Sequence, residues 1–160
     1  MCVYVGKCDL GKGVFAARPI AAGEMLFAIG GIIIDFATVH ARGERECYPV
    51  QIATDQYIDV VEPGSYLNHS CDPNVGIRLG NIVVALRDIQ RDEEIRFDYS
   101  TTMGENCWTM NCRCGSKRCR GIITDFELLA PEVRQEYITL GIVQPFLLAT
   151  SDPLKFRING

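Results

Sequence analysis

Short apolar runs separated by turn-forming residues make up most of the chain as far as Tyr99. Each run is rich in β-branched or aromatic residues and is bounded by Gly, Pro, Asn or Asp, which is typical of short β-strands. The expected strands cover residues 1–5, 14–17, 25–29, 32–36, 49–53, 57–61, 75–79, 82–86 and 95–99. We expect Gly11-Lys12-Gly13 to form the turn after the first strand or to allow a close backbone approach, and Gly80-Asn81 to form a two-residue hairpin loop. The pattern predicts a mainly β protein.

A helical pattern is found only near the C-terminus. Pro131 suits the first turn of a helix, Val133 and Tyr137 lie on one face of it, and Gly141 can end it. A polar and charged segment at 37–47 is expected to be a short insertion, helical or exposed, that interrupts the strands. The sequence therefore predicts few helices and a C-terminal helical segment that packs as a brace.

The composition is that of an ordinary globular protein. The chain has 160 residues, 48% of them apolar and 22% charged, which suits one domain with a sizeable core. The formal net charge of −4 argues against direct binding to nucleic acid, which relies on clustered Lys and Arg, and favours a basic partner. Residues 1–7 lack the features of a secretory signal, and the apolar run at 25–34 is too short to span a membrane. We expect a soluble intracellular protein, cytoplasmic with the nucleus not excluded, and no membrane partner.

The segment 68–74 carries the densest group of candidate functional side chains. Asn68, His69, Ser70 and Cys71 place an amide, an imidazole, a hydroxyl and a thiol in consecutive positions. Each of these groups needs a hydrogen-bonding partner if it is buried, so such a run is unusual in a loop that only connects strands. The segment is the first candidate for a functional site.

Three cysteines further along the chain have the spacing of metal ligands. Cys112, Cys114 and Cys119 follow a C-x-C-x4-C pattern. A structural zinc site requires four ligands in a tetrahedron, so one place remains open, and Cys71 and Cys107 are both candidates for it. The alternative is a disulfide or a set of unliganded thiols, but eight cysteines in a chain without a secretory signal favour metal. We expect a structural zinc ion.

Four motifs, in the order found here, resemble those of the SET-domain protein lysine methyltransferases. They are Gly11-Lys12-Gly13-Val14-Phe15, the segment from Asn68 to Asn74, Glu93-Glu94-Ile95-Arg96-Phe97-Asp98-Tyr99, and the C-x-C-x4-C cluster followed by Arg120-Gly121. The resemblance implies several small β-sheets around a knot-like core, in which the Asn-His segment threads through a loop formed by the later strand and meets Tyr99.

The same resemblance divides the chain into three parts. It implies a SET domain at 1–105 with the short insertion at 37–47, a zinc-bound post-SET segment at 106–123 and a C-terminal helical extension at 124–160. A compact protein without a cysteine-rich pre-SET region is expected.

The resemblance also assigns roles to residues. It implies that S-adenosylmethionine, the methyl donor, is bound by Gly11, Lys12, Gly13, Tyr48, Asn68 and His69. It makes Tyr99 the catalytic residue that orients the substrate amine. It places Phe97 in the substrate channel, where the absence of a hydroxyl leaves room for more than one methyl group per lysine. It selects Cys71 as the fourth zinc ligand beside Cys112, Cys114 and Cys119. The expected partner is a protein of basic character that carries the target lysine.

One departure from the family pattern leaves a second function open. Family members often carry Glu-Tyr-x-Gly-Glu where this chain has Ala28-Ile29-Gly30-Gly31-Ile32, so that Ile29 replaces a tyrosine that helps to wall the lysine channel. The alternative to an enzyme is a catalytically silent, zinc-stabilised SET-like module for protein interaction. The retention of Asn68, His69 and Tyr99 favours the enzyme.

Overall fold

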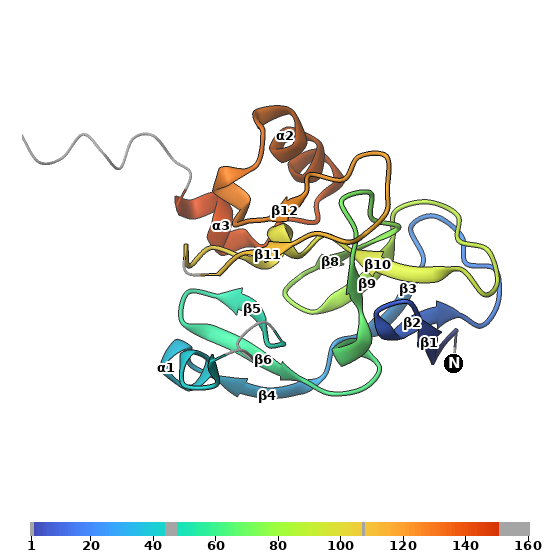
Figure 1. Cartoon of the computed structure of the whole chain (residues 1–160), viewed down its shortest axis with the longest axis horizontal. Helices are drawn as coiled ribbons and strands as arrows, with labels where there is room; N and C mark the ends of the chain where they lie inside the picture. The colour runs from blue at the N-terminus through green and yellow to red at the C-terminus, as the bar shows by residue number, and fades with distance from the viewer. Residues whose placement is uncertain (1, 44–47, 107, 151–160) are drawn as a thin grey trace, which may run out of the picture.

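The computed structural model describes residues 2–43, 48–106 and 108–150, and within these ranges the chain forms four small β-sheets with a few short helices (Figure 1). The mainly β class predicted from the sequence is thereby confirmed. No helix in the described ranges has both the length and the apolar composition needed to cross a bilayer.

The first sheet brings early and late segments of the chain side by side. Its strands lie in the order β1 (Val3–Cys8), β2 (Gly11–Ala16), β10 (Glu94–Phe97) and β7 (Asn68–His69). In the antiparallel β1–β2 hairpin, Cys8 pairs with Gly11, so the loop consists of Asp9 and Leu10. The expected turn at Gly11-Lys12-Gly13 is therefore wrong, because these residues lie inside β2 and pair with β1.

Two three-stranded sheets and one short hairpin complete the β structure. One three-stranded sheet has the order β3 (Met25–Ala28), β9 (Ile82–Ala85), β8 (Val75–Arg78). The other has the order β4 (Gly31–Ile34), β6 (Gln56–Val60), β5 (Val50–Ala53). The hairpin consists of β11 (Met110–Asn111) and β12 (Ile122–Ile123). The predicted β8–β9 hairpin is present, but Arg78 pairs with Ile82, so its loop has three residues, not two. Leu79 and Gly80 both take positive φ in this loop, which accounts for the extra residue.

The helices are short and lie mainly after the last long strand. They are α1 (Phe36–His40), α2 (Pro131–Leu140), α3 (Pro145–Thr150) and the 3-10 turns η2 (Gly64–Tyr66), η3 (Tyr99–Thr102) and η4 (Phe126–Leu128). α1 falls in the expected insertion, where the Asp35 carboxylate caps it by accepting a hydrogen bond from the Thr38 N–H at 2.8 Å. α2 begins at Pro131 and ends at Gly141, whose φ of 66° is the left-handed conformation of a helix C-cap, as the sequence predicted.

Two apolar clusters form the core. The larger lies among the sheets and includes Val14, Val83 and Ile95, each fully buried. The smaller lies under the C-terminal helices and includes Phe126 and Tyr137, each with 1% of its surface exposed. Figure 1 shows α2 and α3 together with β11 and β12 on one side of the molecule, and the sheet of β4, β5 and β6 on the opposite side. The C-terminal helices thus have a core of their own. Helix α2 also contacts the cysteine-rich segment, residues 112–119, through the ion pair between Glu136 and Arg118.

Candidate active site and metal centre

Strands β7 and β10 bring the Asn-His segment beside the late Phe-Asp-Tyr segment. They pair in parallel, with Asn68 beside Arg96 and His69 beside Phe97. Strand β10 ends at Phe97. The next residue, Asp98, caps η3, because its carboxylate accepts a hydrogen bond from the Ser100 N–H at 3.0 Å, and the chain turns into η3 at Tyr99. Tyr99 was expected within a strand, and the Asp98 cap explains why it begins a 3-10 turn instead.

Tyr99 is held from three sides. Its hydroxyl donates a hydrogen bond to the Leu67 carbonyl oxygen at 2.8 Å. Its ring packs edge-on to the His69 imidazole, with centroids 5.2 Å apart, and lies 4.9 Å from the Phe97 ring. Two segments that are 30 residues apart in sequence therefore share one small cluster.

A cavity of about 640 Å³ opens beside this cluster. Its volume is in the range of small-molecule sites. Of the eight residues predicted for the donor, the lysine channel and catalysis, five line it, namely Tyr48, Asn68, His69, Phe97 and Tyr99, and Gly11, Lys12 and Gly13 do not. Arg113 and Cys114 from the cysteine-rich segment form part of its wall, so the cavity lies between the sheets and that segment.

The Gly11-Lys12-Gly13 stretch contacts the site through the Asn68 side chain. The Asn68 amide nitrogen Nδ2 donates to the Lys12 carbonyl oxygen at 3.0 Å and to Glu94 Oε1 at 2.8 Å. A Cβ on Gly13 would lie 2.6 Å from that same Glu94 oxygen and 3.2 Å from Asn68 Nδ2. Gly13 is required because two neighbouring side chains pack against its backbone. Of this hairpin, Leu10 is the residue that lines the cavity.

Tyr48 and Ile29, which the sequence also singled out, lie at the cavity and in the apolar core, respectively. Tyr48 lines the cavity with 60% of its surface exposed. Ile29, expected in place of a channel tyrosine, is 2% exposed and packs in the larger core cluster. Ile29 is not among the described residues that line the cavity.

His69 is buried and has a fixed tautomer. The backbone N–H of Tyr99 donates to its Nδ1 at 3.2 Å, so Nδ1 carries a lone pair and the ring proton is on Nε2. Nε2 lies 3.2 Å from the Cys71 sulfur, to which it can donate. Burial lowers the pKa of His69 to about 4, although the neighbouring Asp98 carboxylate opposes this shift. The imidazole is therefore neutral at physiological pH.

Four cysteines converge next to His69. The sulfur atoms of Cys71, Cys112, Cys114 and Cys119 all lie within 4.8 Å of one another. The Cys71 and Cys112 sulfurs are 3.7 Å apart, close to the roughly 3.8 Å edge of a tetrahedron with Zn–S bonds of ~2.3 Å. Burial raises the pKa of the Cys71 thiol, so a bound cation is needed to hold it as a thiolate. The donor set and its spacing fit a structural zinc ion. Cys107, the other candidate ligand, lies outside the described residues.

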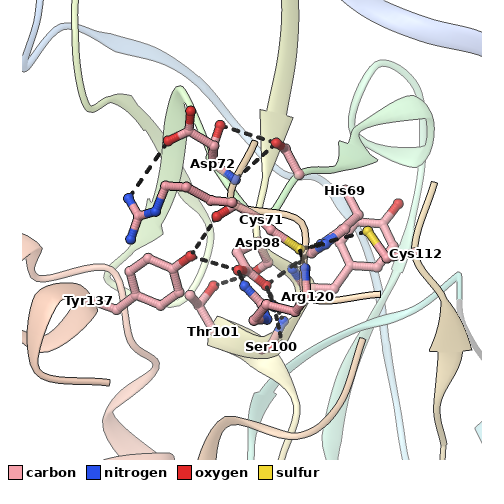
Figure 2. A network of polar contacts seen from close by, with 12 residues as sticks. His69, Cys71, Asp72, Asp98, Ser100, Thr101, Cys112, Arg120 and Tyr137 are labelled. Carbon is pink, nitrogen blue, oxygen red and sulfur yellow. Dashed lines mark hydrogen bonds and ion pairs between the residues drawn. The ribbon is translucent and has the colours of Figure 1, made fainter. Parts of the chain in front are cut away.

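A buried polar network that the sequence did not predict lies beside the cysteines. Figure 2 shows the Asp98 carboxylate at its centre, with Arg120 and Tyr137 directed toward it. Asp98 is 1% exposed and Tyr137 is equally buried. The signal available in the sequence was a charged residue, Asp98, between two aromatic residues at the end of a strand, because a charge that is buried among aromatic side chains needs a partner.

Comparison with known proteins identifies one family. Residues 11–100 match the family model described as SET domain. The chain is 32% identical to human histone-lysine N-methyltransferase 2B over 126 residues, 69% of this chain and 5% of that protein. It is 34% identical over 130 residues to the H3 lysine-36 specific histone-lysine N-methyltransferase of Yarrowia lipolytica, covering 71% of this chain and 17% of that one.

Two further matches extend the comparison. The chain is 32% identical over 138 residues to histone-lysine N-methyltransferase ASHH3 of Arabidopsis thaliana, 74% of this chain and 36% of that protein. Among solved structures, a humanized mutant of the Chaetomium thermophilum Polycomb Repressive Complex 2 bound to the inhibitor GSK126 aligns with a TM-score of 0.56 and 25% identity, over 64% of this chain and 15% of that one. The chain spans between 5% and 36% of the length of the three curated relatives.

Proposed function

This chain belongs to the SET-domain family, and from that premise we propose that it transfers methyl groups from S-adenosylmethionine to the ε-amine of lysine in a protein. The observation that carries the proposal is the cavity lined together by Asn68, His69 and Tyr99. The names of the relatives, all histone-lysine methyltransferases, support the reaction class.

The donor is assigned to the part of the cavity next to Asn68 and His69. S-adenosylmethionine, when bound, supplies a methyl group on a positively charged sulfur, which an amine can attack. We assign its binding to Gly11, Lys12, Gly13, Tyr48, Asn68 and His69. The fit is supported by the packing of Gly13 against Glu94 and Asn68, which holds the strand and the amide in one fixed arrangement.

Tyr99 and Phe97 are assigned to the lysine. A free lysine has a pKa of about 10.4 and is charged at neutral pH, so the site must favour the neutral amine. An apolar channel does this by removing water from the ammonium group. Because the Tyr99 hydroxyl donates to the Leu67 carbonyl, its oxygen remains an acceptor that can orient an amine N–H. Alignment of this kind can supply several kcal/mol of the barrier.

We further propose that more than one methyl group is added to each lysine. Phe97 lines the cavity beside Tyr99 and has no hydroxyl. A tyrosine at this position would offer a hydrogen bond that holds water or restricts the amine, and phenylalanine leaves that space to a methylated amine.

Zinc is assigned a structural role. Bound to Cys71, Cys112, Cys114 and Cys119, it would fix the cysteine-rich segment to the loop that follows strand β7. Because Arg113 and Cys114 line the cavity, the metal would hold one wall of the site in place. A short segment without a core of its own gains folding free energy from such a metal.

The substrate is proposed to be a lysine in a basic protein segment. The relatives' names refer to histones, and the net charge of this chain is −4. An acidic surface increases the rate at which a basic segment is encountered. No direct binding to nucleic acid and no membrane attachment is part of this proposal.

The test is transfer of labelled methyl groups from S-adenosylmethionine to a mixture of basic proteins. The wild type should label protein lysines, and Tyr99→Phe should lose most of the label while retaining donor binding, measured by calorimetry. Donor binding without labelling in the wild type would identify a silent module. No rise in melting temperature at saturating S-adenosylmethionine would contradict the enzyme and leave the zinc-stabilised interaction module, because a ligand that binds only the folded state must raise its stability.

A further inference from the structure

Asp98 directly precedes Tyr99, and its carboxylate is buried with a full set of donors. The Arg120 guanidinium approaches it with two N–H groups, at 2.6 Å to Oδ2 and 2.9 Å to Oδ1. The Tyr137 hydroxyl donates to Oδ2 at 2.7 Å. The Ser100 N–H donates to Oδ1 at 3.0 Å. A buried carboxylate needs such partners, because an uncompensated charge in the interior is strongly unfavourable.

The position of Asp98 sets the backbone that carries Tyr99. Its carboxylate caps η3, and its carbonyl oxygen accepts from the Thr101 hydroxyl at 2.7 Å and the Thr101 N–H at 3.0 Å. The next peptide N–H, that of Tyr99, is held by His69. A shift of the Asp98 side chain would therefore move the turn from which the Tyr99 hydroxyl projects.

One of the donors to Asp98 comes from a distant helix. Tyr137 lies in α2, outside residues 11–100, which match the family model. It is 1% exposed, and its hydroxyl also lies 3.5 Å from the Cys71 carbonyl oxygen. The preceding residue, Glu136, pairs with Arg118 of the cysteine-rich segment. Figure 2 shows Tyr137 pointing from α2 into the network, toward Asp98 and Cys71.

We propose that Tyr137 is a positioning residue for methyl transfer, which acts through the Asp98 carboxylate to hold Tyr99 in its working orientation. The inference rests on the proposed function and deepens it, because it makes the C-terminal helix part of the transfer site. Arg120 provides the charge that compensates Asp98, and Tyr137 provides the directional hydrogen bond that fixes its Oδ2. The hydroxyl of Tyr137 is thus required for the geometry of Tyr99, in addition to the packing of the Tyr137 ring.

The test compares Tyr137→Phe with two control variants. Tyr137→Phe keeps the ring and removes the one hydroxyl. Tyr4→Phe removes a hydroxyl that donates to a carboxylate at the surface, Asp92, at 2.9 Å. Val143→Ala weakens the smaller core cluster, to which Tyr137 belongs, without removing a polar group of the network. All are assayed well below the melting temperature of the least stable variant.

We expect Tyr137→Phe to lower kcat by about tenfold, with KM for the donor and the bound zinc unchanged. We also expect faster hydrogen exchange of the amides of residues 99–101, a readout that does not depend on activity. Tyr4→Phe and Val143→Ala should retain wild-type kcat and wild-type exchange at these amides.

Three results would overturn the inference. Unchanged kcat and exchange in Tyr137→Phe would show that the hydroxyl does not position Tyr99, while the proposed function would stand if the wild type transfers methyl groups. An equal loss of kcat in Val143→Ala would mean that general stability, and not the hydroxyl, accounts for the effect. A wild type that transfers no methyl group overturns the proposed function, and the inference with it.

Discussion

The backbone N–H of Tyr99 donates a hydrogen bond to Nδ1 of His69 at 3.2 Å, and this bond determines what the imidazole can do. With the lone pair on Nδ1 used, the proton on Nε2 faces the Cys71 sulfur at 3.2 Å. The ring therefore connects the proposed catalytic turn to a proposed zinc ligand. Protonation of Nδ1 would break this connection, because it would place two donors opposite each other.

The first prediction is that acid weakens the fold through His69. The unfolded imidazole has a pKa of about 6.5, and burial lowers the folded value to about 4. Since the folded pKa is the lower one, the stabilising contribution is complete above pH 6.5 and is lost as the pH falls toward 4. The difference corresponds to about 3 kcal/mol. Urea unfolding at a series of pH values measures it.

A variant that lacks the buried imidazole tests this prediction. In His69→Gln the free energy of unfolding should fall less steeply with acid between pH 6.5 and 5 than in the wild type. Parallel slopes for the wild type and His69→Gln would contradict a neutral, buried imidazole.

The sequence predicted the strands and helices more accurately than the turns that connect them. Regular apolar runs identified most strands and the extent of α2, because periodicity and capping residues act locally. Two glycines at 11 and 13 suggested a turn, but the hairpin closes at Asp9-Leu10 and uses the glycines for close packing against Glu94 and Asn68. A local pattern does not distinguish these two uses of glycine.

In the candidate site, too, local patterns predicted some of the residues, and the rest depend on the tertiary structure. Cys112, Cys114 and Cys119 could be grouped from spacing alone, whereas Cys71 could be added only through the family resemblance. The network of Asp98, Arg120 and Tyr137 joins three segments of the chain that no local pattern connects. Its existence follows from the burial of a charge, and burial is a property of the tertiary structure.

The second prediction concerns Gly13. An alanine there would place Cβ 2.6 Å from Glu94 Oε1 and 3.2 Å from Asn68 Nδ2, so the strand or the Asn68 amide must move. Overpacking of this kind costs about 1–3 kcal/mol, and we expect Gly13→Ala to weaken donor binding by about tenfold. Titration calorimetry with S-adenosylmethionine measures the change. Gly30→Ala is the matched control, because the nearest neighbour of its Cβ would be Val61 Cγ2 at 3.6 Å, an ordinary van der Waals distance. Equal affinities of the two variants for S-adenosylmethionine would refute the prediction.

The third prediction concerns the metal. The four sulfurs that lie within 4.8 Å of one another should bind one zinc ion per chain. Cys119→Ser should lose most of the zinc, and a strong chelator should lower the melting temperature of the wild type by more than about 10 °C. Cys2→Ser should keep full zinc content, because the Cys2 sulfur lies outside the cluster and donates to the Leu26 carbonyl oxygen at 3.3 Å. Elemental analysis of the purified variants measures their zinc content. A wild type that contains no zinc and keeps its melting temperature in the presence of the chelator would contradict the prediction.

The last prediction concerns the number of methyl groups. Phe97 is 4% exposed, and its ring centroid lies 4.9 Å from that of Tyr99 beside the cavity. A hydroxyl added in Phe97→Tyr would occupy space and offer a hydrogen bond where a methylated amine must turn to present its lone pair again. We expect the wild type to give di- or trimethyl-lysine on long incubation, and Phe97→Tyr to stop mainly at monomethyl-lysine with a similar first transfer. Mass spectrometry of the product separates these states. Phe27→Tyr is the control, because it adds a hydroxyl in β3 away from the cavity, and it should leave the distribution of methylation states unchanged. If the wild type yields monomethyl-lysine alone, Phe97 does not leave the space proposed for a methylated amine.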